Sequence, residues 1–106
     1  MTRPPALCRY RRRVFALLLE VSADESDLDW AREGLPGEAV PRMLDLEAVS
    51  GYWLAPQGGR GVAVVLFETE DQARRAAAAF EVGGQAGPVP EVAFRTVEVR
   101  EVLARL

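Results

Sequence analysis

The segment RGVAVVLFETEDQARRA, residues 60–76, changes from a strand pattern to a helix pattern within a few residues. Its first eight residues are mostly apolar and rich in valine, a composition that favours a strand. Thr69 and Gln72 have the spacing of a capping box, which predicts that a helix begins between them. Apolar side chains then recur on one helical face, at Ala73, Ala76, Ala77 and Phe80. The segment therefore predicts a buried strand that leads directly into an amphipathic helix.

A similar unit precedes this segment. Residues 14–21 form an apolar run interrupted only by Glu20, long enough for a strand and too short for a helix. Ser22 and Glu25 have capping-box spacing and predict that a helix follows this strand. Glycine and proline interrupt the apolar stripe of that helix, so we expect it to be long but broken. The apolar residues of its two pieces are Leu28, Ala31, Leu35, Val40, Met43 and Leu44.

A hairpin is expected between the two units. Residues 49–55 form a strand that Pro56 is expected to end, and the loop 57–59 joins this strand to the one that begins at Arg60. A phosphate-binding loop would open onto a helix N-terminus. The glycines at 58 and 59 open onto a strand, so they predict a hairpin.

The end of the chain supplies the last strand. The second helix is expected to end at Gly83 and Gly84, and a proline-containing loop at 87–90 leads to a strand at 92–104. Polar residues alternate in this strand, as in an edge strand. The order strand–helix–strand–strand–helix–strand predicts an α+β protein, a ferredoxin-like βαββαβ sandwich with a four-stranded antiparallel sheet. Both helices would cover one face of the sheet and leave the other open.

The composition limits the chemistry that the chain can perform. Hydrophobic residues make up 49% and charged residues 27%, which predicts one globular domain over residues 14–106. The chain has no His, Lys, Asn or Ile, a bias typical of a GC-rich bacterial genome. Without His or Lys, imidazole bases, His-bound haem or zinc and Schiff bases are excluded. The acids at 24–29 lack calcium-loop spacing, so we expect no metal and no cofactor.

Residues 1–13 differ from the body in charge. They hold five Arg and no acid, whereas residues 14–106 hold eight Arg and sixteen Asp and Glu, a net charge of −8. We expect this basic tail to lack fixed structure. The apolar run that follows the tail is shorter than an export signal needs. The alternatives are an export signal with a shortened apolar run, a basic arm that touches nucleic acid or membrane, and translation that starts at Val14. The single Cys8 cannot form an internal disulfide, which favours the cytoplasm.

The strand at 60–67 also matches most of the RNA-recognition signature K/R-G-F/Y-G/A-F-V-x-F/Y. It departs at Val62 and Val64, where that signature carries stacking aromatics. The acidic body opposes phosphate backbones as well, so nucleic acid is not the expected partner.

The same alignment predicts which side chains lie on the open face. It points the following six away from the helices: Phe15, Leu17, Leu19, Val62, Val64 and Leu66. At about 1.5–3 kcal/mol for each buried side chain, leaving them in water forfeits on the order of 10 kcal/mol, comparable with the stability of a domain. We therefore expect a second copy of the sheet to cover them in a homodimer.

Three motifs between Val40 and Glu70 carry a resemblance to a known superfamily. They are V-P-R-x-L/M, V-S-G-Y-W-L-A-P and G-R-G-x-x-V-V-L-F-E-T-E. The pattern is similar to that of the dimeric α/β-barrel superfamily, and within it to the antibiotic biosynthesis monooxygenase-like group, over about residues 14–103. The resemblance implies that two sheets pair into a barrel and that a small organic or aromatic ligand binds between sheet and helices. Some members oxygenate anthrones without metal or flavin, and relatives degrade haem.

The residues that carry those activities are present only in part. Without His or Asn, neither haem ligation nor an Asn-assisted oxygenation site can be transferred. Trp30, Tyr52 and Trp53 are of the right type and are the expected ligand-binding residues. Tyr52 and Trp53 point to opposite faces of their strand, so we expect one in the core and the other at the dimer interface. Trp30 lies about 200° around the helix from Leu28, so it is exposed, at an interface or in a pocket wall.

Three functional hypotheses follow. The first is a cytoplasmic homodimer that binds a small apolar or aromatic molecule, with cofactor-independent monooxygenase activity implied by the resemblance. Oxygen chemistry would then depend on the carbanion of the substrate, and no catalytic residue can be assigned. The alternatives are a non-catalytic interaction or regulatory module of the same fold and a degenerate RNA-recognition-like domain.

Overall fold

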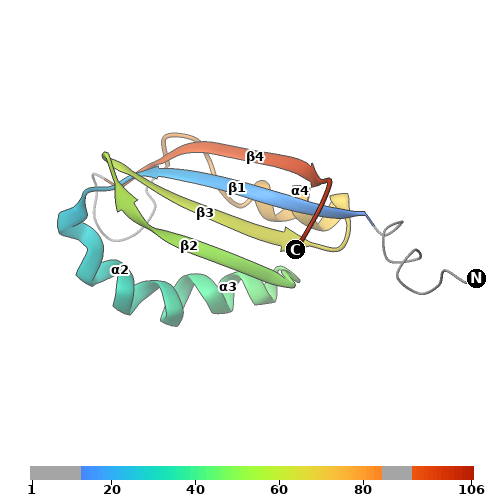
Figure 1. Cartoon of the computed structure of the whole chain (residues 1–106), viewed down its shortest axis with the longest axis horizontal. Helices are drawn as coiled ribbons and strands as arrows, with labels where there is room; N and C mark the ends of the chain where they lie inside the picture. Colours follow the sequence, from blue (N-terminus) through green and yellow to red (C-terminus); the bar gives the residue numbers. More distant parts are fainter. Residues whose placement is uncertain (1–12, 85–91) are drawn as a thin grey trace, which may run out of the picture.

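The computed structural model describes residues 13–84 and 92–106, and its strands and helices follow the expected order (Figure 1). The strands are β1 (Val14–Ser22), β2 (Ser50–Gln57), β3 (Arg60–Phe67) and β4 (Phe94–Val102). The helical segments are η1 (Glu25–Asp27), α2 (Leu28–Gly34), η2 (Leu35–Ala39), α3 (Val40–Asp45) and α4 (Glu70–Ala77). No helix in these ranges is long and apolar enough to cross a membrane. Cys8, with the rest of residues 1–12, and the expected loop at 87–90 lie outside the described residues.

The four strands form one antiparallel sheet in the order β2-β3-β1-β4. The two apolar strands are central and the other two are edges, as their patterns predict. An α+β chain with this sheet order is compatible with a ferredoxin-like fold. Strand β2 continues beyond Pro56 to Gln57, farther than expected, with a shift in register between Leu54 and Gln57. An edge strand tolerates proline because only one side of it must donate to the ladder.

The hairpin between β2 and β3 closes through two glycines. Gly58 and Gly59 have φ angles of 62° and 79°, and Gln57 pairs with Arg60 across them. Two successive positive φ angles are what a tight two-residue hairpin loop requires, and glycine adopts them without steric cost. The expected hairpin is confirmed.

The expected orientation of β1 is wrong. Phe15, Leu17 and Leu19 pair with Phe67, Val65 and Ala63 and belong to the same buried core. Since directly paired residues of antiparallel strands share a face, the three β1 side chains point toward the helices and not away from them. The alternate residues of β1 lie on the open face, where the Glu20 carboxylate accepts hydrogen bonds from Arg60 (2.9 Å) and Thr96 (3.1 Å).

Helix α4 packs closely on the sheet. Its capping box is confirmed: the Gln72 N–H donates to Thr69 Oγ1 (3.1 Å) and the Thr69 N–H donates to Gln72 Oε1 (3.2 Å). Ala73 and Ala76 have no exposed surface, because these small side chains let the helix approach the core. The helix ends at Ala77, earlier than expected, and Ala77 and Phe80 pack against the core from the turn that follows.

The other helical layer is long and broken, as predicted. Its middle segment η2 is a π-helix in which the Val40 N–H bonds to the Leu35 carbonyl. Pro36 and Pro41 cannot donate to the regular ladder, which favours this wider turn. From α2, η2 and α3 only Ala31 and Met43 are buried, whereas Leu44 of the expected apolar set is 62% exposed.

The first helical segment of this layer begins later in the chain than the sequence predicts. Ser22 remains in β1, and its N–H bonds to the Ala93 carbonyl at 2.9 Å. The helical turn begins two residues later, where the Asp27 carboxylate accepts from the Asp24 N–H at 2.9 Å. The sheet therefore holds the chain extended through the position where the sequence predicts a helix to begin.

One residue of the expected basic tail, Arg13, is described. It lies just before β1 and donates to the Glu101 carboxylate at 3.1 Å across to the end of β4. This hydrogen bond, together with the charge of Glu101, raises the pKa of the Arg13 guanidinium.

Candidate functional site

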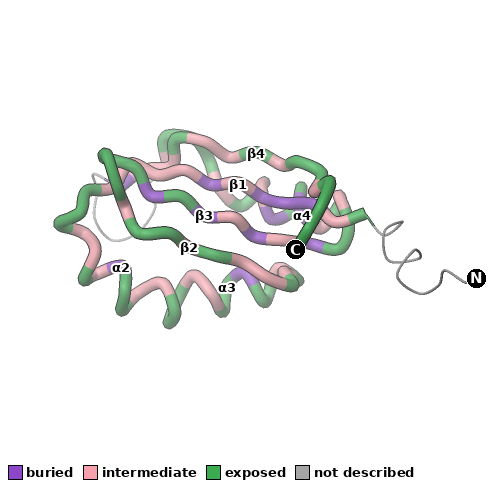
Figure 2. Tube along the Cα trace, in the orientation of Figure 1, coloured by how far each residue is buried: buried purple, intermediate pink, exposed green. Residues whose placement is uncertain are grey.

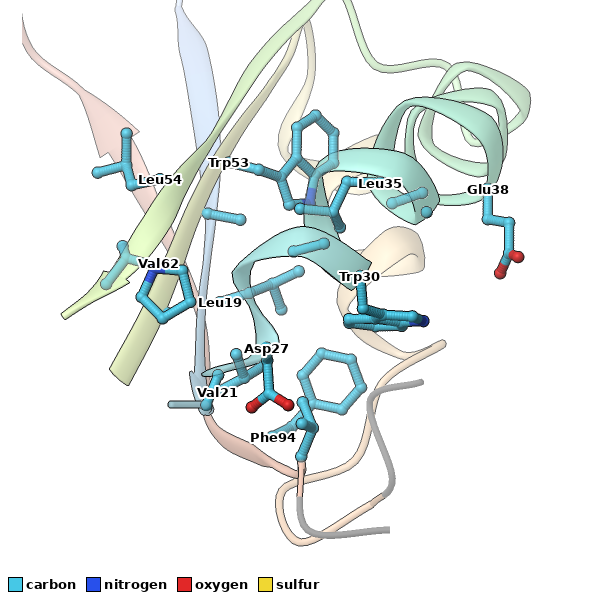
Figure 3. Close-up of a pocket in the computed structure, with 18 of the residues that line it drawn as sticks. Leu19, Val21, Asp27, Trp30, Leu35, Glu38, Trp53, Leu54, Val62 and Phe94 are labelled. Carbon is cyan, nitrogen blue, oxygen red and sulfur yellow. The ribbon is translucent and has the colours of Figure 1, made fainter. Parts of the chain in front are cut away.

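A cavity of about 290 Å³ lies between the broken helix and the sheet (Figure 3). Its sheet side includes helix-facing residues of β1, β2 and β3, among them Leu19, Trp53 and Ala63, and it extends at the end of the β2–β3 hairpin to Leu54 and Val62. Its helix side is formed mainly by α2 and η2, which present small residues to it at Ala31, Gly34 and Ala39. The volume is at the lower limit of ordinary ligand pockets, about 300–1,000 Å³.

The looseness of the helix layer explains why the cavity exists. Few side chains of α2, η2 and α3 are buried, whereas buried residues are concentrated on β1, β3 and α4 (Figure 2). Glycine and alanine on the inner side of α2 and η2 leave space where larger side chains would fill the layer. Apolar side chains therefore border a space between the helix and the sheet that is large enough for a small molecule.

Two tryptophans line this cavity from opposite sides. Trp30 projects from α2, and a Cβ at Gly34 would lie 3.8 Å from its indole, so the ring covers the next turn of its own helix. Trp53 projects from β2 between the sheet and the helix (Figure 3). Of the alternatives for Trp30, the structure places it in a pocket wall. Trp53 also packs against the core, as expected for one member of the Tyr52–Trp53 pair.

Tyr52 is not brought together with the two tryptophans. It pairs with Val64, whereas Trp53 pairs with Ala63, so the two aromatic residues lie on opposite faces of the sheet as expected. Tyr52 is 65% exposed on the open face. The cavity therefore contains two of the three residues that the sequence suggests for ligand binding.

Two further aromatics close one side of the cavity. Phe80 follows α4 and Phe94 begins β4, and their rings meet edge to face at 5.1 Å. The sequence does not suggest either residue, because their segments become neighbours only when β4 enters the sheet. With Trp30 and Trp53 they make four aromatic side chains around one space.

Three charged residues line the cavity: Asp27, Glu38 and Arg42. The Asp27 carboxylate already accepts the hydrogen bond that starts the helix. Glu38 extends from the outer side of the helix, away from Leu19 and Trp53 (Figure 3). The Arg42 guanidinium lies 4.9 Å from the centre of the Phe80 ring. Arg42 belongs to the V-P-R motif, but nothing in the sequence alone connects it with a cavity.

The described residues contain no group of three His, Cys, Asp or Glu side chains that could hold a metal ion. The acids near the start of α2 lie in η1 and its flanks, where Asp27 serves as a helix cap. The charged groups of the lining are therefore the Asp27 carboxylate, which is already hydrogen-bonded, the Glu38 carboxylate, which extends outward, and the Arg42 guanidinium.

The open face of the sheet is apolar toward β2 and polar toward β4. Tyr52, Leu54 and Val62 are exposed there, and Val64 and Leu66 are partly exposed beside them. By its register Leu18 joins this patch, in place of the β1 residues expected from the sequence. Toward β4, ion pairs link Arg60 to Glu20 and Arg100 to Glu98, each at 2.9 Å.

Comparison with known proteins adds no assignment. No protein-family model matches the chain, and neither the curated proteins nor the solved structures contain a significant match. The interpretation of the site therefore depends on its geometry and chemistry.

Proposed function

We propose that the protein binds a small aromatic or apolar molecule in the cavity between the broken helix and the sheet. The observation that supports this is a space of about 290 Å³ lined by four aromatic side chains from four separate segments. A cavity of about 150 Å³ lined by apolar side chains is large enough to bind benzene. Apolar walls with a few polar groups are the usual composition of small-molecule sites.

The binding can be tested with a neutral two-ring probe, 2-naphthylmethanol, by isothermal titration calorimetry. We expect one molecule to bind per chain and Trp53→Ala to weaken binding at least tenfold, because the indole forms one wall. Tyr52→Ala removes an aromatic residue from the adjacent position and should leave the affinity unchanged. Equal affinity of the two variants, or no binding by the wild type, would contradict the proposal.

We further propose that two copies associate through their open faces, as in dimeric α/β barrels. The patch formed by Leu18, Tyr52, Leu54, Val62, Val64 and Leu66 supports this, because an exposed apolar area of this kind usually marks an interface. A two-fold dimer would place each patch against its equivalent. In this arrangement the cavities lie on the outer sides of the two sheets.

Sedimentation equilibrium tests the dimer. Val64→Asp places a charge in the centre of the patch and should convert the dimer to a folded monomer, because a buried unpaired carboxylate is costly. Val82→Asp makes the same change at an exposed position outside the sheet and should leave the dimer intact. A wild-type protein that sediments as a monomer at micromolar concentration overturns this part of the proposal.

A cofactor-independent monooxygenase is the activity that the resemblance to antibiotic biosynthesis monooxygenases implies. Conversion of an anthrone and O₂ into an anthraquinone and water needs a proton acceptor and an aromatic site, and the cavity supplies the aromatic walls. Oxygen uptake with an anthrone, measured with wild type and Trp53→Ala, separates this activity from a non-catalytic binding module. The RNA-recognition alternative gains no support, because Val62 and Val64 occupy the stacking positions on the open face.

A further inference from the structure

Arg42 is the only basic side chain that lines the cavity within the described ranges. Its guanidinium lies against the ring of Phe80, with 4.9 Å between Cζ and the ring centre. Phe80 packs against the core and meets Phe94 at 5.1 Å, so this ring is itself held in place. Contact with a fixed ring restricts the position of the guanidinium, and less side-chain freedom is then lost when it binds a ligand.

The hydrogen-bond donors of Arg42 are not used by an acid in the part of the chain that the structure describes. The ion pairs found there involve other arginines, namely Arg13, Arg60, Arg74, Arg75 and Arg100. The two acids of the cavity do not pair with Arg42 either, since Asp27 caps the helix and Glu38 extends outward (Figure 3). A cation–π contact with one ring leaves N–H donors of the guanidinium for another partner.

The position of this arginine is informative because the body of the protein is acidic. Residues 14–106 have a net charge of −8, so the basic side chain that lines this cavity is opposite in sign to most charged residues of the body. The acidic body repels anions at long range, but charges beyond about 8–10 Å are largely screened at physiological salt. At contact distance the Arg42 guanidinium, which forms no ion pair with an acid of residues 13–84 or 92–106, therefore determines which charge the cavity accepts.

We propose that the cavity binds a compact aromatic molecule with an anionic oxygen group, a carboxylate or phenolate, and that Arg42 is the residue that selects this charge. The inference rests on the proposed binding function and specifies the ligand class of the same cavity. The rings would lie among Trp30, Trp53 and Phe94, and the anionic group would receive the N–H groups of Arg42. At about twice the volume that binds benzene, the cavity suits two fused rings.

Three probes of matched shape test this inference by isothermal titration calorimetry: 2-naphthoate, 2-naphthylmethanol and 2-naphthylmethylammonium. The wild type should bind the carboxylate about tenfold more tightly than the alcohol, and the ammonium least tightly, because a charge-assisted hydrogen bond is lost in each replacement. Arg42→Gln should abolish the preference for the carboxylate over the alcohol, and Arg42→Lys should restore part of that preference. Arg105→Gln removes the same charge away from the cavity and should retain the full preference.

The possible results separate this inference from the proposed function. If the alcohol binds but the carboxylate is not preferred, or if Arg42→Gln retains the preference, Arg42 does not select the ligand and the inference is overturned. If none of the three probes binds to the folded wild type, the cavity is not an aromatic site and both proposals are overturned. Raising the salt concentration should reduce the preference for the carboxylate and leave binding of the alcohol unchanged.

Discussion

The two helical layers that cover the same face of the sheet are packed differently. Helix α4 places two fully buried alanines on the core, whereas the longer layer of α2, η2 and α3 buries one residue from α2 and one from α3. The short helix begins at a complete capping box and lies close to the sheet. The long layer contains a π-helix that includes Pro36 and is followed by Pro41, and it forms one wall of the cavity. One layer thus contributes packing and the other contributes space for a ligand.

The largest expected effect on stability comes from substitutions that enlarge a side chain between a helix and the sheet. Ala73→Leu should lower the free energy of unfolding by about 1–3 kcal/mol, because α4 has no room for extra methyl groups. Ala39→Leu adds the same atoms beside the cavity and should change stability by less than about 0.5 kcal/mol. Urea unfolding of both variants measures the difference, and equal losses would show that the two layers are equally packed.

A smaller loss of stability is expected when a hydrogen bond at the start of either layer is removed. Thr69→Ala removes the side chain that accepts from the Gln72 N–H and should cost about 1 kcal/mol of stability. Asp27→Ala removes the carboxylate that accepts from the Asp24 N–H at the start of the loose layer. Less packing depends on this start, so the loss of stability should be smaller than for Thr69→Ala. Thermal unfolding of the two variants ranks them, and a larger loss for Asp27→Ala would reverse the comparison.

The smallest expected effect is a gain in stability at Gly34. This glycine has helical angles, φ −78° and ψ −39°, and an added Cβ would meet the Trp30 indole at an ordinary 3.8 Å. Gly34→Ala should therefore raise the free energy of unfolding by about 0.4–1 kcal/mol, because it restricts the unfolded chain. Gly58→Ala, at a φ of 62°, is the control and should be destabilising. A loss at Gly34 would indicate that the loose layer cannot accept even a methyl group.

Much of the fold could be predicted from local pattern, and the orientation of β1 shows where this fails. The residues of β1 are apolar on both faces, so periodicity alone does not fix which face is buried. The single charge at Glu20 holds the missing information: because it must face solvent, Leu17 and Leu19 must face the core. The RNA-recognition signature implies the opposite orientation, because its spacing does not take account of this carboxylate, and that orientation is wrong.

The candidate site could be predicted only in part, for a different reason. Trp30 and Trp53 are visible in the sequence as large aromatics in unusual positions. Phe80, Phe94 and Arg42 come from segments far apart in the chain, and their contacts arise only from the tertiary arrangement. The cavity itself depends on how closely a helix approaches the sheet, a property of many small contacts that no local pattern encodes.

Hydrogen–deuterium exchange with and without 2-naphthylmethanol tests the central claim most directly. We predict that the amides of α4 exchange slowly in both states, because that helix is packed independently of any ligand. The amides of α2 and η2 should exchange faster in the free protein and slow down on binding, since the ligand fills the space beneath them. Equal protection of both layers in the free protein, or protection by the ligand on the open face of the sheet instead, would contradict the account.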